Sequence, residues 1–232
     1  MLTLRRSDTR GQADFGWLKS AHSFSFGEYY DPQFMGFGAL RVINEDHVAP
    51  GAGFGTHPHK DMEIISYVLD GNLAHKDSTG GGSTIGPGTV QRMSAGTGIQ
   101  HSEYNGSDSD QVHFLQIWLL PERADLTPSY EEKAFDLAAH ANNLVLLAAN
   151  DLGNAALKVH QDVNLYGAQL DAGNEITFTP DSNRKVWLQL AKGALHVNGM
   201  VMTAGDGLAV EDEAKLTIAA NDNVEFLLFD LT

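Results

Sequence analysis

The sequence predicts an all-β protein of two tandem jelly-roll β-barrel domains, with short helices only in the connections. Three observations lead to this prediction. Apolar runs of strand length recur through the first half, separated by turn signals roughly every 8–12 residues. No long segment before residue 121 shows the apolar period of a helix. The second half then repeats the order of strands and turns of the first half.

The amino-acid composition narrows the classes of partner. The chain has 232 residues, enough for one large β domain or two smaller ones, and 42% of them are hydrophobic. Its formal net charge of −15 would repel nucleic-acid phosphates and an anionic membrane surface, although Arg5, Arg6 and Arg10 cluster near the start. The absence of cysteine removes disulfides and thiolate ligands, so histidines and carboxylates would have to hold any metal ion.

The N-terminal segment MLTLRRSDTRGQADFGW lacks the apolar run of a signal peptide. No apolar stretch of the sequence approaches the ~20 residues of a membrane-spanning helix. We therefore expect a cytoplasmic protein, and we expect it to be a monomer.

The first strands of the sequence contain aromatic residues. His22, Phe24 and Phe26 alternate with serines and would share one face of a strand. Aromatic residues are common in strand cores, and the same face could instead line an aromatic pocket. Residues 36–44 (GFGALRVIN) follow as a buried strand, with glycines where two backbones approach closely.

The next segments predict a hairpin and a long apolar strand. Residues 64–69 (IISYVL) form a fully buried strand that ends at Asp70-Gly71, a strong hairpin signal, so residues 72–77 should return as its partner. A glycine-rich loop and a Pro-Gly turn come next. Residues 112–120 (VHFLQIWLL) then form a long apolar strand that Pro121 closes.

The stretch PERADLTPSYEEKAFD at residues 121–136 is the most polar part of the chain, and we place the domain boundary there. The predicted domains are residues 1–133 and residues 134–232. The segment 186–197 resembles the segment 64–75, and Gly-Asp-Gly at 205–207 corresponds to Gly-Pro-Gly at 86–88. These correspondences indicate an internal duplication. The second copy lacks the histidine motifs described next, so we predict chemistry in the first copy alone.

Two motifs each place two potential metal ligands one residue apart: His57 and His59, and His101 and Glu103. Residues two apart on a β-strand point to the same face, roughly 6.5–7 Å apart along the backbone, so both side chains can lean onto one ion. On neighbouring strands, the two motifs would create a site of three imidazoles and one carboxylate. The other histidines outside the aromatic strand are predicted to be solvated or hydrogen-bonded structural residues: His47, His75, His113, His140, His160 and His196.

These motifs resemble those of a known family. The pattern HxHxxxE at 57–63, followed by Gly71, Pro87-Gly88 and GxxHxxxN at 98–105, is similar to the two cupin motifs. The longer segments HPHKDMEIISYVLDG, MSAGTGIQHSEYN and HSFSFGEYYDPQFMGFGALRVINED resemble the pirin family, and in particular its bacterial quercetin 2,3-dioxygenases. The resemblance covers at least residues 15–120, and the second domain agrees in pattern. It implies a bicupin, with one cupin barrel in each domain and the metal site in the first.

The resemblance also implies a set of metal ligands. Pirins hold their metal with three histidines and a glutamate, which in this sequence are His57, His59, His101 and Glu103. A general cupin would use Glu63 as the carboxylate instead, and Glu63 would face the site if its strand were unbroken. We favour Glu103 on the resemblance and expect Glu63 to orient a ligand or balance charge.

The activity implied by the resemblance is oxygenolysis of a flavonol such as quercetin, with O₂ consumed and carbon monoxide released. The cofactor would be one divalent transition metal, with Fe(II) expected and Mn, Co, Ni, Cu or Zn as alternatives. The metal would lower the pKa of the bound 3-hydroxyl group, and Glu103, or otherwise Glu63, would take the proton as general base. Candidate walls for a flat aromatic substrate are Phe24, Phe26, Tyr29, Phe37, Phe54 and Trp118.

Two other functions are compatible with the same motifs. One is a metal-containing regulatory protein of the pirin type, for which the acidic charge favours a protein partner over DNA. The other is a zinc or nickel isomerase of the cupin type, which would act on a sugar or keto acid without O₂. Loss of the flavonol absorption band in air, together with release of carbon monoxide, would distinguish the dioxygenase from both.

Overall fold

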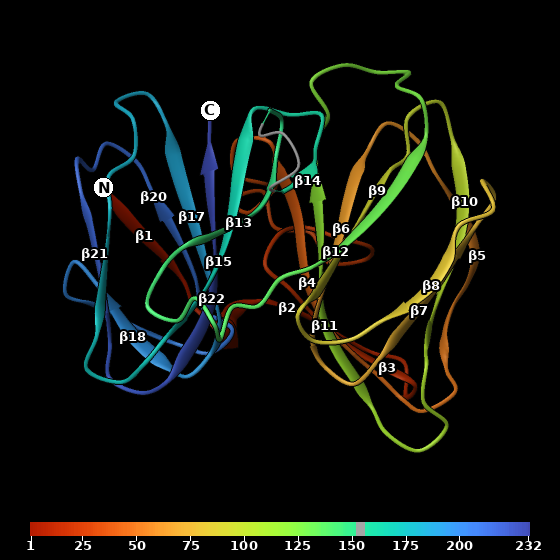
Figure 1. Cartoon of the computed structure of the whole chain (residues 1–232), viewed down its shortest axis with the longest axis horizontal. Coiled ribbons are helices and arrows are strands. Elements are labelled where there is room, and N and C mark those ends of the chain that lie inside the picture. The colour runs from red at the N-terminus through yellow and green to blue at the C-terminus, as the bar shows by residue number, and fades with distance from the viewer. Residues whose placement is uncertain (152–155) are drawn as a thin grey trace. The chain divides into compact units, whose positions relative to one another are not determined.

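The computed structural model describes residues 1–151 and 156–232, which form two compact units (Figure 1). The N-terminal unit contains Gly11–Ala134 and Leu157–Gln161. The C-terminal unit contains Met1–Arg10, Phe135–Ala156 and Asp162–Thr232. In the described residues, the one helical element is the 3-10 turn η1 (Ser7–Thr9), and the all-β prediction is confirmed.

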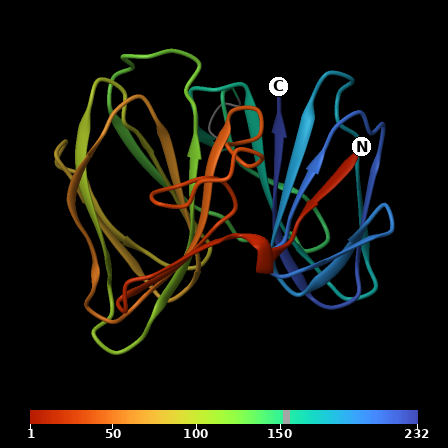
Figure 2. The same ribbon diagram turned by 180° about the vertical axis from the view of Figure 1, so that it is seen from behind.

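The predicted domain ranges, 1–133 and 134–232, stay a prediction. The compact units differ from them at the start of the chain, because β1 (Leu2–Arg5) pairs antiparallel with β20 (Gly207–Val210). Figure 2 shows this first strand, in red, beside the blue strands of the C-terminal unit. They also differ at β14 (Leu157–Lys158), which belongs to the N-terminal unit.

The N-terminal unit consists of two antiparallel sheets that face each other as layers (Figure 1). In spatial order, the larger sheet contains β12 (Ser129–Ala134), β9 (Thr89–Ser94), β6 (Glu63–Asp70), β11 (Val112–Leu119), β4 (Leu40–Val48), β3 (Leu18–His22) and β2 (Gly11–Asp14). The smaller sheet contains β5 (Gly53–His59), β10 (Ile99–Asn105), β7 (Leu73–Asp77) and β8 (Gly82–Ile85). This arrangement is the predicted jelly-roll barrel.

The turn after β6 leads the chain from one sheet into the other. Gly71 has a φ of 76°, and a Cβ at this position would lie 2.6 Å from the carbonyl oxygen of Gln111, so the turn requires glycine. Strand β7 then pairs with β8 and β10. The predicted pairing of residues 64–69 with residues 72–77 is therefore wrong, because the turn at Asp70-Gly71 is a corner between two sheets rather than a hairpin.

The central strands β4 and β11 present different side chains on the two faces of the larger sheet. Their register places Asn44 opposite Gln116 and His47 opposite His113. Asn44 and Gln116 line a cavity inside the unit. His47 and His113 lie an odd number of residues from them, and successive strand residues alternate in direction, so both histidines lie on the opposite face of the sheet.

The C-terminal unit repeats the same plan. The strands that this unit contributes to its larger sheet are, in order, β1, β20, β17 (Lys185–Lys192), β22 (Val224–Leu231), β15 (Val163–Leu170) and β13 (Val145–Ala149). Its smaller sheet contains β16 (Glu175–Phe178), β21 (Leu216–Ala220), β18 (Ala194–Val197) and β19 (Met200–Thr203). The order β20-β17-β22-β15 matches β9-β6-β11-β4, and the smaller sheets match strand for strand, which confirms two tandem barrels.

The interiors of the two barrels differ in polarity. Strand β10 of the N-terminal unit carries buried His101 and Glu103. The corresponding strand β21 of the C-terminal unit carries Leu216 and Ile218, both fully buried in an apolar core. The duplicated fold therefore encloses buried polar side chains on this strand in one unit and apolar side chains on the matching strand in the other.

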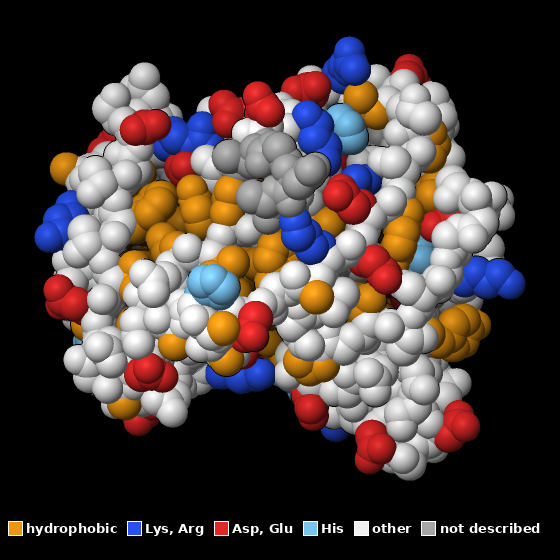
Figure 3. All heavy atoms as spheres, viewed as in Figure 1, with side chains coloured by type: hydrophobic (Ala, Val, Ile, Leu, Met, Phe, Trp, Pro, Cys, Tyr) orange, Lys and Arg blue, Asp and Glu red, His pale blue; other side chains and the backbone are white. Residues whose placement is uncertain are grey.

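The charged side chains are distributed over the surface. On the face shown in Figure 3, acidic and basic side chains are interspersed, in keeping with a net charge of −15 that is spread over many positions. In the described part of the chain, no helix is both long and apolar enough to cross a membrane.

Candidate metal centre

Three histidines meet inside the N-terminal unit. Strands β5 and β10 are direct neighbours, and their register places His101 opposite His57. The ring centroids are 4.5 Å apart for His57 and His101, 4.8 Å for His57 and His59, and 4.8 Å for His59 and His101. One ring nitrogen of each histidine lies within 4.8 Å of those of the other two. The structure thus brings together the three histidines that the spacing singled out.

Two imidazoles of this cluster, those of His59 and His101, are in the form that binds metal ions. Burial lowers the pKa of His59 to about 4, with the charge of His57 as the second cause. Burial, again followed by the charges of His57 and His59, lowers the pKa of His101 to about 3. Both rings are therefore neutral at pH 7, and a neutral ring has a nitrogen lone pair to donate.

Hydrogen bonds orient two of the three rings. His57 Nδ1 lies 2.8 Å from the carbonyl oxygen of Gly55, so it holds the proton and leaves Nε2 as the ligand atom. His101 Nε2 is buried and has no hydrogen-bond partner among the described residues. A buried nitrogen without a partner is costly unless something binds it. The two rings therefore offer lone pairs at the centre of the cluster.

Glu103 lies beside the cluster on strand β10 and is 1% exposed. Its Oε1 accepts a hydrogen bond from Ser66 Oγ (3.1 Å), and its Oε2 accepts one from Gln116 Nε2 (2.7 Å). Burial raises its pKa, against the opposing effect of nearby His75 and of these hydrogen bonds. A carboxylate oxygen of Glu103 lies within 4.8 Å of ring nitrogens of His101 and His75. Glu103 thus joins the cluster through His101.

His75 extends this network behind His101. Its Nε2 lies 3.1 Å from Asp77 Oδ2, and its Nδ1 lies 3.2 Å from Gln91 Nε2 and 3.5 Å from His101 Nδ1. The structural role predicted for His75 agrees with these contacts. Its position between Asp77 and the cluster was not predicted, because β7 was assigned to the wrong sheet. His75 thus lies against the Nδ1 side of the His101 ring, whereas Nε2 of that ring has no partner among the described residues.

Glu63 lies away from the cluster. The connection at residues 60–62, in which Asp61 has a φ of 48°, separates β5 from β6. The strand is broken there, so even spacing along the chain no longer places Glu63 on the face of the histidines. Glu63 Oε2 instead accepts hydrogen bonds from Ser94 Oγ (2.9 Å) and from the backbone N–H of His160 (3.2 Å). The structure does not bring Glu63 to the site in which the sequence placed it.

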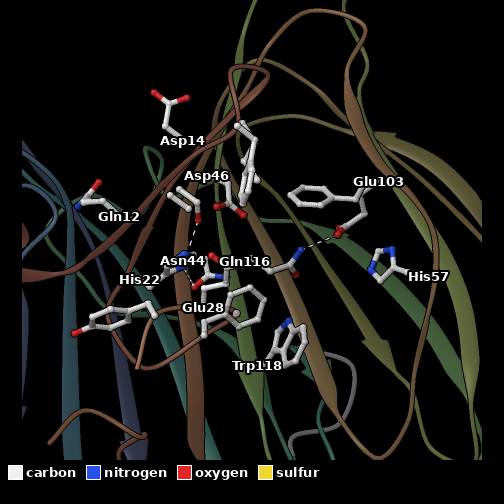
Figure 4. A pocket seen from close by; sticks show the side chains of 18 of the residues that line it. Gln12, Asp14, His22, Glu28, Asn44, Asp46, His57, Glu103, Gln116 and Trp118 are labelled. Atoms are coloured by element: carbon white, nitrogen blue, oxygen red, sulfur yellow. Dashed lines mark hydrogen bonds between the residues drawn. The ribbon is translucent and has the colours of Figure 1, made fainter. Parts of the chain in front are cut away.

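A cavity of about 500 Å³ opens beside the cluster, and His57, His59 and Glu103 form part of its wall (Figure 4). Its volume lies within the range of about 300–1,000 Å³ that is typical of small-molecule sites. Aromatic side chains line it, as predicted for Phe26, Tyr29, Phe54 and Trp118. The Trp118 ring stands edge-on to His59, with centroids 5.0 Å apart, and to Phe26, at 5.4 Å.

Two of the predicted wall residues, Phe24 and Phe37, do not line this cavity. Strand β3 ends at His22, so the alternation that would have aligned Phe24 with it stops there, and Phe24 is 1% exposed. Phe37 lies in a tight turn that it closes by backbone hydrogen bonds with Leu40. Periodicity failed at these two positions because the segment between β3 and β4 consists of turns.

Polar residues that the sequence did not single out complete the cavity. Asp46 and Gln116 reach it from β4 and β11 (Figure 4). Three buried polar atoms of the cavity-lining residues have no hydrogen-bond partner among the described residues: Asp46 Oδ1, Gln116 Oε1 and Trp118 Nε1. Burial raises the pKa of Asp46 to about 7, although a hydrogen bond from Ser20 lowers it. The cavity therefore combines aromatic walls with isolated polar atoms.

Comparison with known proteins agrees with the sequence motifs. The family model for pirin matches residues 3–119. The chain belongs to the pirin family. A second model, the quercetinase C-terminal cupin domain, matches residues 146–231 of this pirin.

The similarity extends over full-length relatives. This pirin is 49% identical to the quercetin 2,3-dioxygenase of Escherichia coli (strain K12), over 100% of this chain and 99% of that protein. It is 42% identical to a pirin-like protein of Caulobacter vibrioides, over 99% of both chains. Among solved structures, it resembles the bacterial pirin YhhW from Escherichia coli in complex with nickel(II). That match has a TM-score of 0.95 and 47% identity, and it covers 100% of this chain and 99% of YhhW.

The residues of the cluster fit a divalent transition metal. Neutral imidazoles and a carboxylate are ligands for first-row transition ions, and no thiolate is present to favour a softer metal. The buried, unpartnered Nε2 of His101 is the observation that an ion would explain most simply. His57, His59 and His101 can therefore hold a metal ion at the wall of the cavity, and Glu103 lies beside them, close to His101.

Proposed function

We propose that this pirin is a cytoplasmic, metal-dependent dioxygenase that cleaves flavonols such as quercetin with release of carbon monoxide. The single observation that carries the proposal is the position of His101 Nε2. This buried, unpartnered nitrogen belongs to a ring that lies beside two further imidazoles, and those two imidazoles line an aromatic cavity that is large enough for a small molecule. The names of the full-length relatives support the same reaction.

The proposed metal ligands are His57, His59, His101 and Glu103, and the proposed ion is Fe(II), with Mn, Co, Ni, Cu or Zn as alternatives. When bound, such an ion supplies Lewis acidity toward the 3-hydroxyl group of the flavonol and a route for electrons to O₂. The protein residues around it bind and orient the substrate.

Glu103 is the proposed general base. It is buried beside the cluster, and Ser66 and Gln116 fix both of its oxygens by hydrogen bonds. Its raised pKa makes it a stronger proton acceptor than an exposed carboxylate. We propose that Glu103 takes the proton of the substrate 3-hydroxyl group, which leaves the flavonol in its electron-rich anionic form.

The cavity walls orient the substrate and exclude water. Phe26, Phe54 and Trp118 offer flat apolar surfaces that match the rings of a flavonol. Asp46 Oδ1 and Trp118 Nε1 are buried polar atoms that can hydrogen-bond to its hydroxyl groups. A substrate without these hydroxyl groups would leave both atoms unpaired, and this penalty favours polyhydroxylated ligands.

A turnover assay tests the proposal. Metal-reconstituted protein is mixed with quercetin in air while the flavonol absorption band, O₂ and carbon monoxide are followed. We expect one O₂ to be consumed and one carbon monoxide to be released per flavonol, and no reaction without O₂. Failure with all six metals would overturn the dioxygenase and leave the regulatory role and the isomerase activity as the remaining interpretations.

Substitution of Trp118 by phenylalanine tests the role of the indole N–H. The variant keeps an aromatic ring beside His59 and Phe26 but removes Nε1, the buried donor without a described partner. Loss of one hydrogen bond should raise the KM for quercetin about 2- to 10-fold and leave kcat within about 2-fold. An unchanged KM would show that Nε1 does not contact the substrate.

The buried carboxyl of Asp46 should make stability depend on pH. At pH values between 3.8, the ordinary pKa of this carboxyl, and about 7, its pKa in the folded protein, the folded protein keeps the Asp46 proton and the unfolded chain releases it. The unfolding free energy of the wild type therefore falls as pH rises through this window, by at most about 1.4 kcal/mol per pH unit from this group. Asp46→Asn removes the effect, so the metal-free variant should gain stability relative to the wild type as pH rises.

Urea denaturation of both proteins at pH 4.5, 5.5, 6.5 and 7.5 measures this difference. The same change at exposed Asp108 controls for the loss of one carboxylate. A difference between Asp46→Asn and wild type that does not grow with pH would contradict a proton held on Asp46.

A further inference from the structure

A second group of metal-ligating side chains lies on the larger sheet of the N-terminal unit. Oxygen and nitrogen atoms of Glu45, His47 and His113, one from each residue, all lie within 4.8 Å of one another. We propose that these three residues form a second metal site, for a divalent ion such as Zn(II), Ni(II) or Cu(II). Two imidazoles and one carboxylate suit these ions, and water would fill the remaining positions.

The sheet separates this site from the cavity. Asn44 and Asp46 on β4 line the cavity, so Glu45 and His47, which alternate with them, lie on the other face. On β11, His113 stands directly opposite His47 in the antiparallel register. The two sites thus occupy opposite faces of the same pair of strands and share no ligand.

The distances within the site are close to those of a metal centre. Glu45 Oε1 and His113 Nε2 lie 2.9 Å apart. Two ligands that bind one ion at about 2.0–2.2 Å with an angle near 90–110° lie about 2.8–3.6 Å from each other. An ion can therefore take the place of the proton that this pair shares, with little movement of either side chain.

The second imidazole is held beside the first. The rings of His47 and His113 are stacked, with centroids 3.9 Å apart and an angle of 15° between their planes. His47 Nδ1 lies 3.2 Å from Gln111 Oε1, an acceptor, so Nδ1 holds the proton and Nε2 keeps its lone pair. A hydrogen bond of this kind on the far nitrogen is a regular feature of histidine metal ligands.

The surroundings allow an ion to enter. The side chains of His113 and Glu45 are 21% and 15% exposed, which leaves the site open to solvent while the sheet fixes its backbone. Lys19 lies opposite His47 on β3 and disfavours a cation, whereas Asp70 lies opposite His113 on β6 and favours one. The net charge of −15 adds a general attraction for divalent ions.

Metal stoichiometry tests the proposal without reference to catalysis. Metal-free protein is titrated with Zn(II) by calorimetry, and the bound metal is counted after gel filtration. The proposal predicts that the double variant His47→Gln/His113→Gln binds one ion per chain fewer than the wild type. His101→Ala should retain the ion at Glu45, His47 and His113. His140→Ala, a change at an exposed histidine outside both groups, should bind as the wild type does.

Cu(II) bound to a variant in which His57, His59 and His101 are all replaced by alanine provides a second measurement, because this variant lacks every imidazole of the first site. Its electron paramagnetic resonance spectrum should show coupling to two imidazole nitrogens, and this signal should vanish when His47 and His113 are also replaced. Equal stoichiometry in the wild type and in the His47→Gln/His113→Gln variant would overturn the proposal. A two-nitrogen spectrum that survives the added substitutions would overturn it as well.

Discussion

Replacement of His101 by alanine should remove the metal ion from the cavity and abolish turnover of quercetin. His101 is the central residue of the cluster, since its ring lies within 4.8 Å of those of both His57 and His59, by centroid distance. Changes to residues that merely support a ligand weaken metal binding about 10- to 100-fold, so loss of a ligand itself should exceed about 100-fold. Metal counting and the rate of carbon monoxide release measure the two effects.

The control for this prediction is the fold of the variant. His101 is buried without a partner for Nε2, so its removal should leave the metal-free protein folded, as circular dichroism would show. His140→Ala, at an exposed histidine, should retain both metal and turnover. Full metal occupancy and turnover in His101→Ala would mean that the ligand assignment is wrong.

Glu103→Gln should impair metal binding and activity, whereas Glu63→Gln should impair stability. Glu103→Gln removes a proposed ligand and the proposed base, so the metal affinity should fall at least about 10-fold and kcat about 100- to 10,000-fold. Glu63→Gln should keep the metal and at least half of the turnover. It should destabilise the protein by about 1–3 kcal/mol, because buried Glu63 accepts hydrogen bonds from Ser94 and from the backbone of His160.

Metal content, kcat and urea denaturation of both variants check this pair of predictions. The opposite result, in which Glu63→Gln loses the metal and Glu103→Gln keeps it, would establish the general cupin ligand set over that of pirins. It would also require Glu63 to turn away from Ser94 and His160.

The histidine cluster could be predicted from the sequence because its signal is local. His57 and His59 share a face by alternation, as do His101 and Glu103, and such spacing survives in any regular strand. The same reasoning failed for Glu63 because the chain breaks between β5 and β6 at Asp61. An even spacing along the chain predicts that two residues share a face only where the strand between them is continuous.

The remaining features depend on contacts between distant segments. Asp46 and Gln116 are single polar residues within apolar strands, and nothing in their local sequence shows that they face a cavity. The sequence predicts structural roles for His47 and His113, and it does not show that they lie side by side. Their pairing arises from the register of β4 with β11. Strand β12 lies in the polar stretch where the sequence predicts a domain boundary. Its composition does not predict a strand, because the strand depends on pairing with β9.

The duplication shows how one fold supports two different interiors. The strands that correspond to one another have the same order in both units. Strand β10 nevertheless presents His101 and Glu103 to its barrel, whereas β21 presents Leu216 and Ile218. Among the described residues, the groups that could hold a metal all lie in the N-terminal unit. The jelly roll sets the positions, and the side chains at those positions decide whether they can bind a metal.

The placement of one metal ion by His57, His59, His101 and Glu103 underlies the whole proposed mechanism. The most direct test is an anomalous difference map from crystals of the metal-loaded protein, recorded on both sides of the absorption edge of the metal. We predict a strong peak at bonding distance from Nε2 of His57 and His101, from a ring nitrogen of His59 and from a carboxylate oxygen of Glu103. A loaded crystal with no peak among these residues would contradict the metal centre.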